Sequence, residues 1–251
     1  MSHRFNVQLK SKLTFSIPNV QSLPPSIDLE SAFPPVFDQG QEGSCTGNGW
    51  AGVWAFFELL DLKQKCAAPE EFSTTSFVPA SRQFIYYCER DHEGTIAQDA
   101  GSQISTGAWV LANIGCCDEA IWPYSQDNWE TKPSTEAYEE AANHKILNSF
   151  ALNDFLDIKH CLADGYPVIC GIEVFDNIES DEVAQTGILN MPTAEDKLQG
   201  GHCVVIVGYD DSTSRFKIRN SWGTTWGMNG YFTVEYCYIS QYGSEFMTLR
   251  K

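Results

Sequence analysis

Basic side chains are scarce in this chain. Its 251 residues include 16 lysines and arginines against 33 aspartates and glutamates, which gives a formal net charge of −17 at pH 7. Nucleic acids and anionic membrane surfaces attract positively charged patches, so this balance argues against both as partners. With 43% apolar residues, the chain can still bury one large core or two modest ones, and we expect a globular protein.

Long apolar runs are also missing. No run approaches the roughly 20 residues that a membrane-spanning helix needs, and the first ten residues lack the apolar centre of a secretory signal. There is no internal repeat and no low-complexity segment. These absences predict a soluble protein in the cytoplasm or another reducing compartment. Non-classical export, or export after removal of a signal, stays open.

The nine cysteines include no Cys-x-x-Cys spacing, which would be the usual sign of a zinc site. Neighbouring acidic residues such as Asp210 and Asp211 fall in a predicted hairpin turn, where we expect them to be solvated. We therefore expect no metal and no cofactor. The odd count is compatible with one reactive thiol, whereas Cys170 and Cys203 lie in apolar, strand-like runs and are expected in the core.

One cysteine has surroundings suited to catalysis. Cys45 follows a glycine-rich loop and begins an apolar helix, in the stretch Asp38-Gln-Gly-Gln-Glu-Gly-Ser-Cys-Thr-Gly-Asn-Gly-Trp50. The positive end of a helix dipole and free backbone N–H groups favour the thiolate, which is the nucleophilic form. The side-chain amide of Gln39 and the Cys45 backbone N–H could then stabilise an oxyanion. Taken alone, a cysteine in an apolar helix is more often a core residue.

Two distant segments supply partners for such a nucleophile. His202 opens the predicted strand in Gly200-Gly-His-Cys-Val-Val-Ile-Val-Gly-Tyr209, and Asn220 ends the next strand, before Ser-Trp-Gly223. A histidine can take the thiol proton, and an asparagine carbonyl can hold its ring in the required tautomer. Each residue alone has an ordinary structural interpretation. Together with Cys45, in this order and in these motifs, they resemble the papain-like cysteine peptidases, from about Pro25 to Tyr231.

The resemblance implies an α+β fold of the papain type. Its first domain is mainly helical, its second is an antiparallel, barrel-like β domain, and the active-site cleft lies between them. We place an N-terminal extension at residues 1–24, the helical domain at 25–133 and the β domain at 134–251. In the implied mechanism, Cys45 is the nucleophile and His202 is the acid and base. Asn220 orients His202, and Gln39 is the oxyanion donor.

The resemblance also implies substrate-binding positions. Gly101 is the counterpart of a glycine-rich strip that hydrogen-bonds the substrate backbone, although an ordinary turn glycine is an equal alternative. Gly171 and Gly200 are expected to wall a wide pocket for large apolar side chains, with tolerance for basic ones because the chain is acidic. Trp222 is expected to shield the contact between His202 and Asn220 from water.

The chain departs from the family in three places. Glu42 stands where the family commonly has a disulfide-forming cysteine, which favours thiols and a reducing compartment. Thr46 stands where a tryptophan usually follows the nucleophile. Only residues 1–24 of this sequence precede the mature-like start, so we expect no long helical prodomain of the family's type. Their apolar strip of Leu13, Phe15 and Ile17 could lie in the cleft as an internal inhibitor, or could pack on the surface.

Apolar periodicity and capping residues predict the remaining elements. Helices are expected after Cys45, after Ser81, over Ser102–Gly115, from about Ser134 and over Asn153–Ala163. Strands are expected over Pro167–Phe175, Cys203–Tyr209, Phe216–Asn220 and Tyr231–Tyr236.

The predicted function is hydrolysis of peptide bonds in proteins or peptides. Endopeptidase activity is the default, because no paired-histidine insertion typical of exopeptidases is evident. A cysteine-dependent acyl transferase, or transpeptidase, is one alternative, since it would share the acyl-enzyme and differ only in using an amine instead of water. A non-catalytic binding protein on the same fold is another, but it would not need all four chemical groups.

Overall fold

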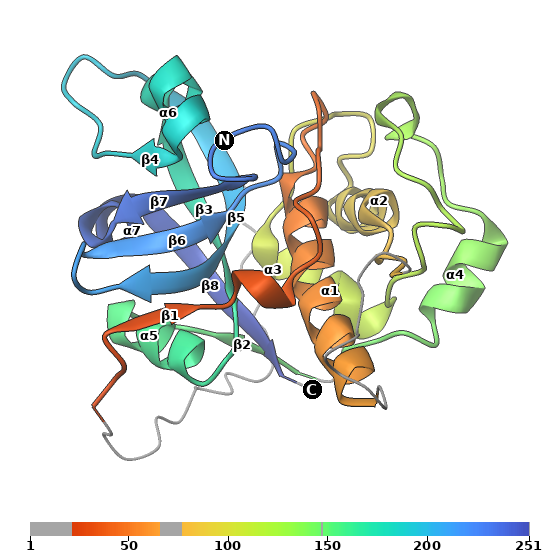
Figure 1. Ribbon diagram of the computed structural model, residues 1–251. Helices are drawn as coiled ribbons and strands as arrows, with labels where there is room; N and C mark the ends of the chain where they lie inside the picture. The colour runs from red at the N-terminus through yellow and green to blue at the C-terminus, as the bar shows by residue number, and fades with distance from the viewer. Residues whose placement is uncertain (1–21, 66–76, 147, 251) are drawn as a thin grey trace.

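A computed structural model describes residues 22–65, 77–146 and 148–250. Its strands form a single sheet with helices gathered mainly beside it (Figure 1). The sheet runs in the order β2-β8-β3-β5-β6-β7-β4, and β1 also pairs with β5. β4 and β7 are parallel, and the other pairings are antiparallel. The strands are β1 (Ser26–Asp28), β2 (Asn148–Ala151), β3 (Val168–Phe175), β4 (Ile188–Leu189), β5 (Leu198–Asp210), β6 (Arg215–Arg219), β7 (Tyr231–Glu235) and β8 (Gly243–Arg250).

Helices α1 to α4 lie on one side of the molecule, while α5, α6 and α7 lie by the sheet (Figure 1). Their bounds are α1 (Cys45–Lys65), α2 (Arg82–Glu93), α3 (Ile104–Asn113), α4 (Thr135–Ala141), α5 (Phe155–Ala163), α6 (Asp181–Thr186) and α7 (Tyr236–Tyr242). Short 3-10 turns cover Glu30–Ala32, Gln126–Asn128 and Asp176–Glu179. In the part of the chain described, no helix combines the length and apolarity needed to cross a bilayer.

Ser81, predicted as a helix cap, begins α2, and Ser134 begins α4, whereas α5 is capped by Asp154, one residue after its predicted start at Asn153. The Ser81 hydroxyl accepts the Phe84 N–H at the start of α2, and the Ser134 hydroxyl accepts the Ala137 N–H at the start of α4. Such contacts satisfy backbone donors that a helix leaves unpaired in its first turn. The α+β fold class predicted from the sequence is confirmed, and the expected helices and strands are found within a few residues of their predicted ends.

The predicted division of the chain at residue 133 differs from the packing. Ala137 and Ala141 of α4 share a core cluster with Phe84 and Cys88 of α2, so the helical part continues to about residue 141. In the opposite direction, β1 pairs with β5, although it belongs to the segment predicted as helical. The apolar strip of Leu13, Phe15 and Ile17 lies outside the described residues.

Glycines in α1 let this helix approach both of its neighbours closely. A Cβ atom on Gly49 would lie 3.0 Å from the Cys203 sulfur of β5, and a Cβ atom on Gly47 would lie 2.6 Å from the Arg82 carbonyl oxygen of α2. This close packing offsets the cost of glycine within a helix, about 1 kcal/mol each relative to alanine. It also places the first residue of α1 against β5, and thereby positions Cys45.

Candidate active site

Cys45 lies at the N-terminus of α1 and lines a cavity of about 320 Å³. The other residues lining this cavity include His202 and Cys203 of β5, so it is bounded by both the helical part and the sheet. The turn before the helix is fixed by Asn48, whose side-chain amide donates to the Ser44 carbonyl at 2.9 Å. The sequence thus places a thiol at a helix N-terminus, where the dipole favours negative charge.

The His202 ring is held by Asn220. Nε2 of His202 lies 2.8 Å from Oδ1 of Asn220, and the same oxygen accepts the backbone N–H of Ser221 at 2.8 Å. A backbone N–H is always a donor, so the second contact fixes which end of the asparagine amide is oxygen. The proton of His202 therefore lies on Nε2, and Nδ1 is the basic nitrogen that can accept a proton from a thiol.

Two tryptophans cover this pair of residues. The Trp222 ring stacks on the His202 ring at a centroid distance of 5.2 Å, and Trp226 lies edge-on to Trp222 at 5.0 Å. Asn220 is 4% exposed and His202 is 8% exposed. A hydrogen bond that is shielded from water in this way is stronger than an exposed one.

Burial disfavours a charge on Cys45 alone or on His202 alone. Although Cys45 is only partly buried as a residue, desolvation of its thiol raises the pKa to about 11, with a smaller lowering by the Cys203 backbone N–H. Desolvation also lowers the pKa of His202, against a smaller upward effect of the Asn220 hydrogen bond. A proton moved from Cys45 to His202 would create two opposite charges in the cavity that both residues line, and opposite charges stabilise each other in a buried site.

Gln39 joins the loop before Cys45 to the segment after Asn220. Its side-chain oxygen accepts the Ser221 hydroxyl at 2.5 Å, and its backbone N–H donates to the Ser221 carbonyl at 2.8 Å. Its amide nitrogen donates to the Glu42 carbonyl at 2.9 Å. A primary amide has two N–H groups, and this contact uses one of them. Gln39 is not among the residues that line the cavity with Cys45 and His202.

The segments that carry Cys45, His202, Asn220 and Gln39 all lie within the match to one protein family. A sequence model described as papain family cysteine protease matches residues 23–247. The chain belongs to the papain family. A peptidase C1-like protein of Acanthamoeba polyphaga mimivirus is 39% identical over 212 residues, which are 81% of this chain and 65% of that protein. The chain thus spans slightly less than two thirds of the length of this relative.

Solved structures share the papain fold. Xylellain, a cysteine protease from Xylella fastidiosa, is 35% identical, with a TM-score of 0.81 over 92% of this chain and 87% of its own. A cysteine protease from Carica candamarcensis, solved in complex with E-64, is 21% identical, with a TM-score of 0.63 over 91% and 99%. The second likeness concerns the fold alone.

The glycines predicted from the papain resemblance lie partly where expected. Gly101 and Gly171 line the cavity, but Gly200 does not, and Gly201 takes its place. In β5, Gly201 is adjacent to His202, whereas Gly200 pairs with Val174 one step farther along the strand. Two successive glycines cannot be told apart by sequence pattern, because neither has a side chain to reveal its face.

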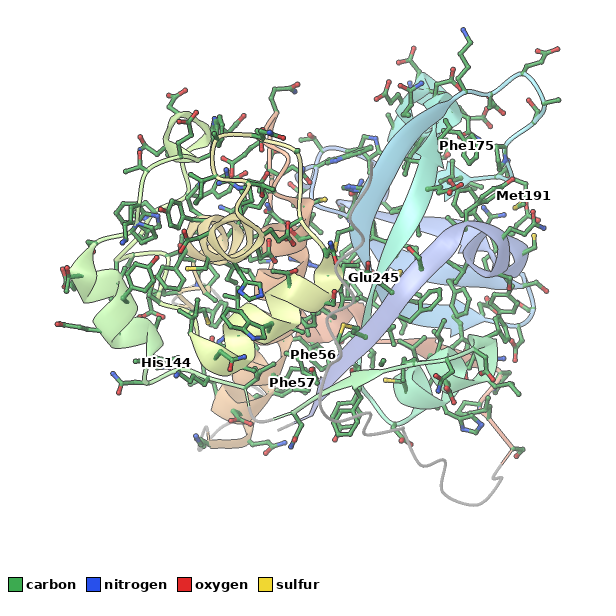
Figure 2. All side chains as sticks on the ribbon, turned by 180° about the vertical axis from the view of Figure 1, so that it is seen from behind. Phe56, Phe57, His144, Phe175, Met191 and Glu245 are labelled. Atoms are coloured by element: carbon green, nitrogen blue, oxygen red, sulfur yellow. The ribbon has the colours of Figure 1, made fainter. Side chains whose placement is uncertain are left out.

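Glu245 and Ser244 line the same cavity and were not predicted. Both belong to β8, a strand that the sequence analysis missed, and Figure 2 shows Glu245 at the junction of the helical part and the sheet. One carboxylate oxygen of Glu245 accepts the Ser105 N–H of α3 at 3.2 Å. This contact holds the Glu245 carboxylate at the wall of the cavity that Cys45 lines.

Glu89 was also missed, although it lies next to the nucleophile. Its carboxylate is fully buried in α2 and accepts the Thr46 hydroxyl at 2.6 Å. Burial raises the pKa of Glu89 well above 4.5, and the charge of Glu89 is one of the smaller effects that raise the pKa of Cys45. Figure 2 shows His144 away from Glu245, which lines the cavity, and His144 contacts Glu140 at 3.1 Å.

No group of three or more histidine, cysteine and acidic side chains suited to holding a metal ion occurs in residues 22–65, 77–146 and 148–250.

Proposed function

We propose that this chain is a cysteine endopeptidase that hydrolyses internal peptide bonds of proteins or peptides. The observation that carries the proposal is the His202 ring, held with its proton on Nε2, in a cavity that it shares with Cys45. Membership of the papain family supports the same chemistry.

The proposed reaction begins with transfer of the Cys45 thiol proton to Nδ1 of His202. The sulfur then attacks the peptide carbonyl, and the resulting oxyanion receives hydrogen bonds from the Cys45 backbone N–H and the free Gln39 amide N–H. Collapse of this intermediate breaks the C–N bond, and the His202 proton goes to the leaving amine. Water, deprotonated by His202, attacks the thioester, and release of the acid restores the thiol.

A labelling experiment tests the assignment of the nucleophile. E-64 is expected to modify wild-type protein at Cys45, and Cys45→Ala is expected to lose both labelling and turnover without a change in thermal stability. Cys203→Ala is the matched control, since Cys203 is another thiol lining the cavity and should be dispensable. Turnover by Cys45→Ala, or labelling at Cys203 instead, would contradict the proposal.

Mass spectrometry of products from a peptide library tests the endopeptidase assignment. Cuts remote from both peptide ends are expected, whereas removal of terminal residues alone would exclude endopeptidase activity. Adding a free amine to the same assay separates hydrolysis from acyl transfer, because a transferase would form the amide of the acyl fragment. We expect the free acid as the main product.

The substrate pocket is proposed to accept large apolar and basic side chains. Gly171 and Gly201 leave room at one wall, Ile104 contributes an apolar surface, and Glu245 contributes a carboxylate. Because Glu245 is exposed, its attraction for a lysine or arginine is that of a surface ion pair, about 0.2 to 1 kcal/mol. A cleavage profile in which small or acidic residues dominate at the substrate position that fills this pocket would contradict the proposal.

The N-terminal extension is proposed to inhibit the cleft in cis. A deletion that reached Pro24 or Pro25 would also remove contacts to the sheet, because the Pro24 carbonyl accepts the Tyr209 hydroxyl and the Pro25 carbonyl accepts the Asp211 N–H. Deleting residues 1–21 keeps these contacts, and is expected to raise activity on small peptides because a tethered inhibitor acts at high effective concentration. Unchanged kinetics would exclude inhibition.

A reducing compartment is proposed as the location of the protein, and its activity should require a reductant.

A further inference from the structure

Asp99 and Tyr86 form a junction between the loop that holds Gln39 and the loop that carries Gly101. We propose that Asp99 is a positioning residue for catalysis, because it holds the peptide group that orients the Gln39 amide, and that Tyr86 holds Asp99 and Gly101 together. This inference rests on the proposed role of Gln39 as the oxyanion donor.

The first observation concerns one peptide group, the one that joins Glu42 to Gly43. Its carbonyl accepts the Gln39 amide N–H at 2.9 Å. Its N–H donates to the Asp99 carboxylate, with both oxygens at 3.0 Å. The peptide therefore stands between the oxyanion donor and Asp99, and a carboxylate on its N–H side polarises its carbonyl into a better acceptor.

The second observation is the hydroxyl of Tyr86, a fully buried side chain on α2. It donates to Asp99 at 2.6 Å and accepts the Gly101 backbone N–H at 3.2 Å. Gly101 lines the same cavity as Cys45. One hydroxyl thus fixes both the carboxylate that supports the Gln39 loop and the backbone that faces the substrate.

The third observation is how closely the two loops approach each other. A Cβ atom on Gly43 would lie 2.9 Å from an Asp99 carboxylate oxygen and 3.2 Å from the Gly101 nitrogen. Only a residue without a side chain permits this contact at Gly43. The hydrogen bonds across the contact therefore set the spacing between oxyanion donor and substrate backbone.

Exposure of Asp99 makes the role testable without unfolding the protein. Asp99→Ala is expected to lower kcat about tenfold, less than the 10²- to 10³-fold typical of losing an oxyanion donor, with KM and thermal stability nearly unchanged. Asp99→Asn should recover part of kcat, since its amide oxygen can still accept one N–H. Asp91→Ala, on the exposed side of α2, removes an equal charge and is the matched control.

Tyr86→Phe is expected to raise KM severalfold, because the Gly101 N–H loses its acceptor and the substrate backbone is held less well. It should also lower kcat, but less than Asp99→Ala does, because Asp99 loses the Tyr86 hydroxyl and keeps the Gly43 N–H. A larger effect on kcat for Asp99→Ala and on KM for Tyr86→Phe is not expected from a general loss of packing. Equal changes in both constants for both variants would overturn the proposal.

The decisive measurement is a double-mutant cycle with Gln39→Ala. If Asp99 acts through Gln39, then Asp99→Ala should lower kcat much less in the Gln39→Ala background than in the wild type. Equal losses in both backgrounds would overturn the proposal while leaving Gln39 as oxyanion donor. If Gln39→Ala alone leaves kcat unchanged, the proposed role of Gln39 fails and the positioning role of Asp99 fails with it.

Discussion

Replacing Glu42 by glutamine is expected to stabilise the protein at pH 8 and to change its stability little near pH 4. Glu42 is 3% exposed, and one carboxylate oxygen accepts the Gln83 amide at 3.0 Å. The other oxygen is buried and has no hydrogen-bond partner in the described part of the chain. Burial, more than the neighbouring charge of Asp99, raises its pKa from 4.5 to about 7, against smaller lowering effects of Gln83, Arg90 and Arg82.

The sign follows from proton binding. Between pH 4.5 and about 7 the folded protein holds a proton on Glu42 that the unfolded chain has released, so stability falls as the pH rises through this window. The shift from 4.5 to about 7 corresponds to about 3 kcal/mol, at 1.36 kcal/mol for each pH unit. This contribution is complete below pH 4.5 and lost above about pH 7. Glutamine has the same shape and no charge to bury, so its variant should lack the loss.

Urea unfolding of both proteins at pH 5 and pH 8 measures the effect. The difference in free energy of unfolding between Glu42→Gln and wild type should be about 2 to 3 kcal/mol larger at pH 8 than at pH 5. Glu130→Gln, on the surface, is the matched control and should show almost the same difference at both pH values. If the Glu42→Gln difference were also equal at the two pH values, Glu42 would not change its charge in this window, and the reasoning would be refuted.

Three further predictions concern catalysis. Gln39→Ala should lower kcat about 10²- to 10³-fold with little change in KM, measured by steady-state kinetics, because the donor acts mainly in the transition state. Asn220→Ala should cost less activity than His202→Ala, since it loosens the base without removing it, and equal losses would indicate damage to folding. Glu245→Gln should lower kcat/KM for peptides with lysine or arginine at the pocket about two- to fivefold relative to leucine peptides, as expected for an exposed ion pair, and an unchanged ratio would exclude Glu245 from specificity.

The residues proposed for catalysis could be predicted from the sequence because each stands at a locally recognisable place. Cys45 follows a glycine-rich loop and begins a helix, and His202 and Asn220 lie near the ends of predicted strands. Such positions depend on turn and capping chemistry within a few residues. The structure brings Cys45 and His202 to one cavity and pairs His202 with Asn220.

Glu245 could not be predicted in the same way, because β8 shows no clear alternation. Met247, Thr248 and Leu249 are all buried, so both faces of this strand are covered and the usual pattern of apolar and polar residues is lost. The pairing of β8 with β3 joins segments about 75 residues apart, and nothing local specifies it. The place of α4 likewise depends on its alanines packing against α2, which is a tertiary contact.

Ser221 connects the two halves of the proposed chemistry. Its backbone N–H fixes the Asn220 oxygen that holds His202, while its carbonyl and hydroxyl bind Gln39. The same residue therefore orients the base and the oxyanion donor, even though these come from opposite sides of the cleft. A shift of the sheet relative to the helices would move His202 away from Cys45 and break the contacts between Ser221 and Gln39. Assembly of the site thus depends on the packing of the helical part against the sheet. The antiparallel bridge between Asp38 and Trp222 adds a contact beside the one between Gln39 and Ser221.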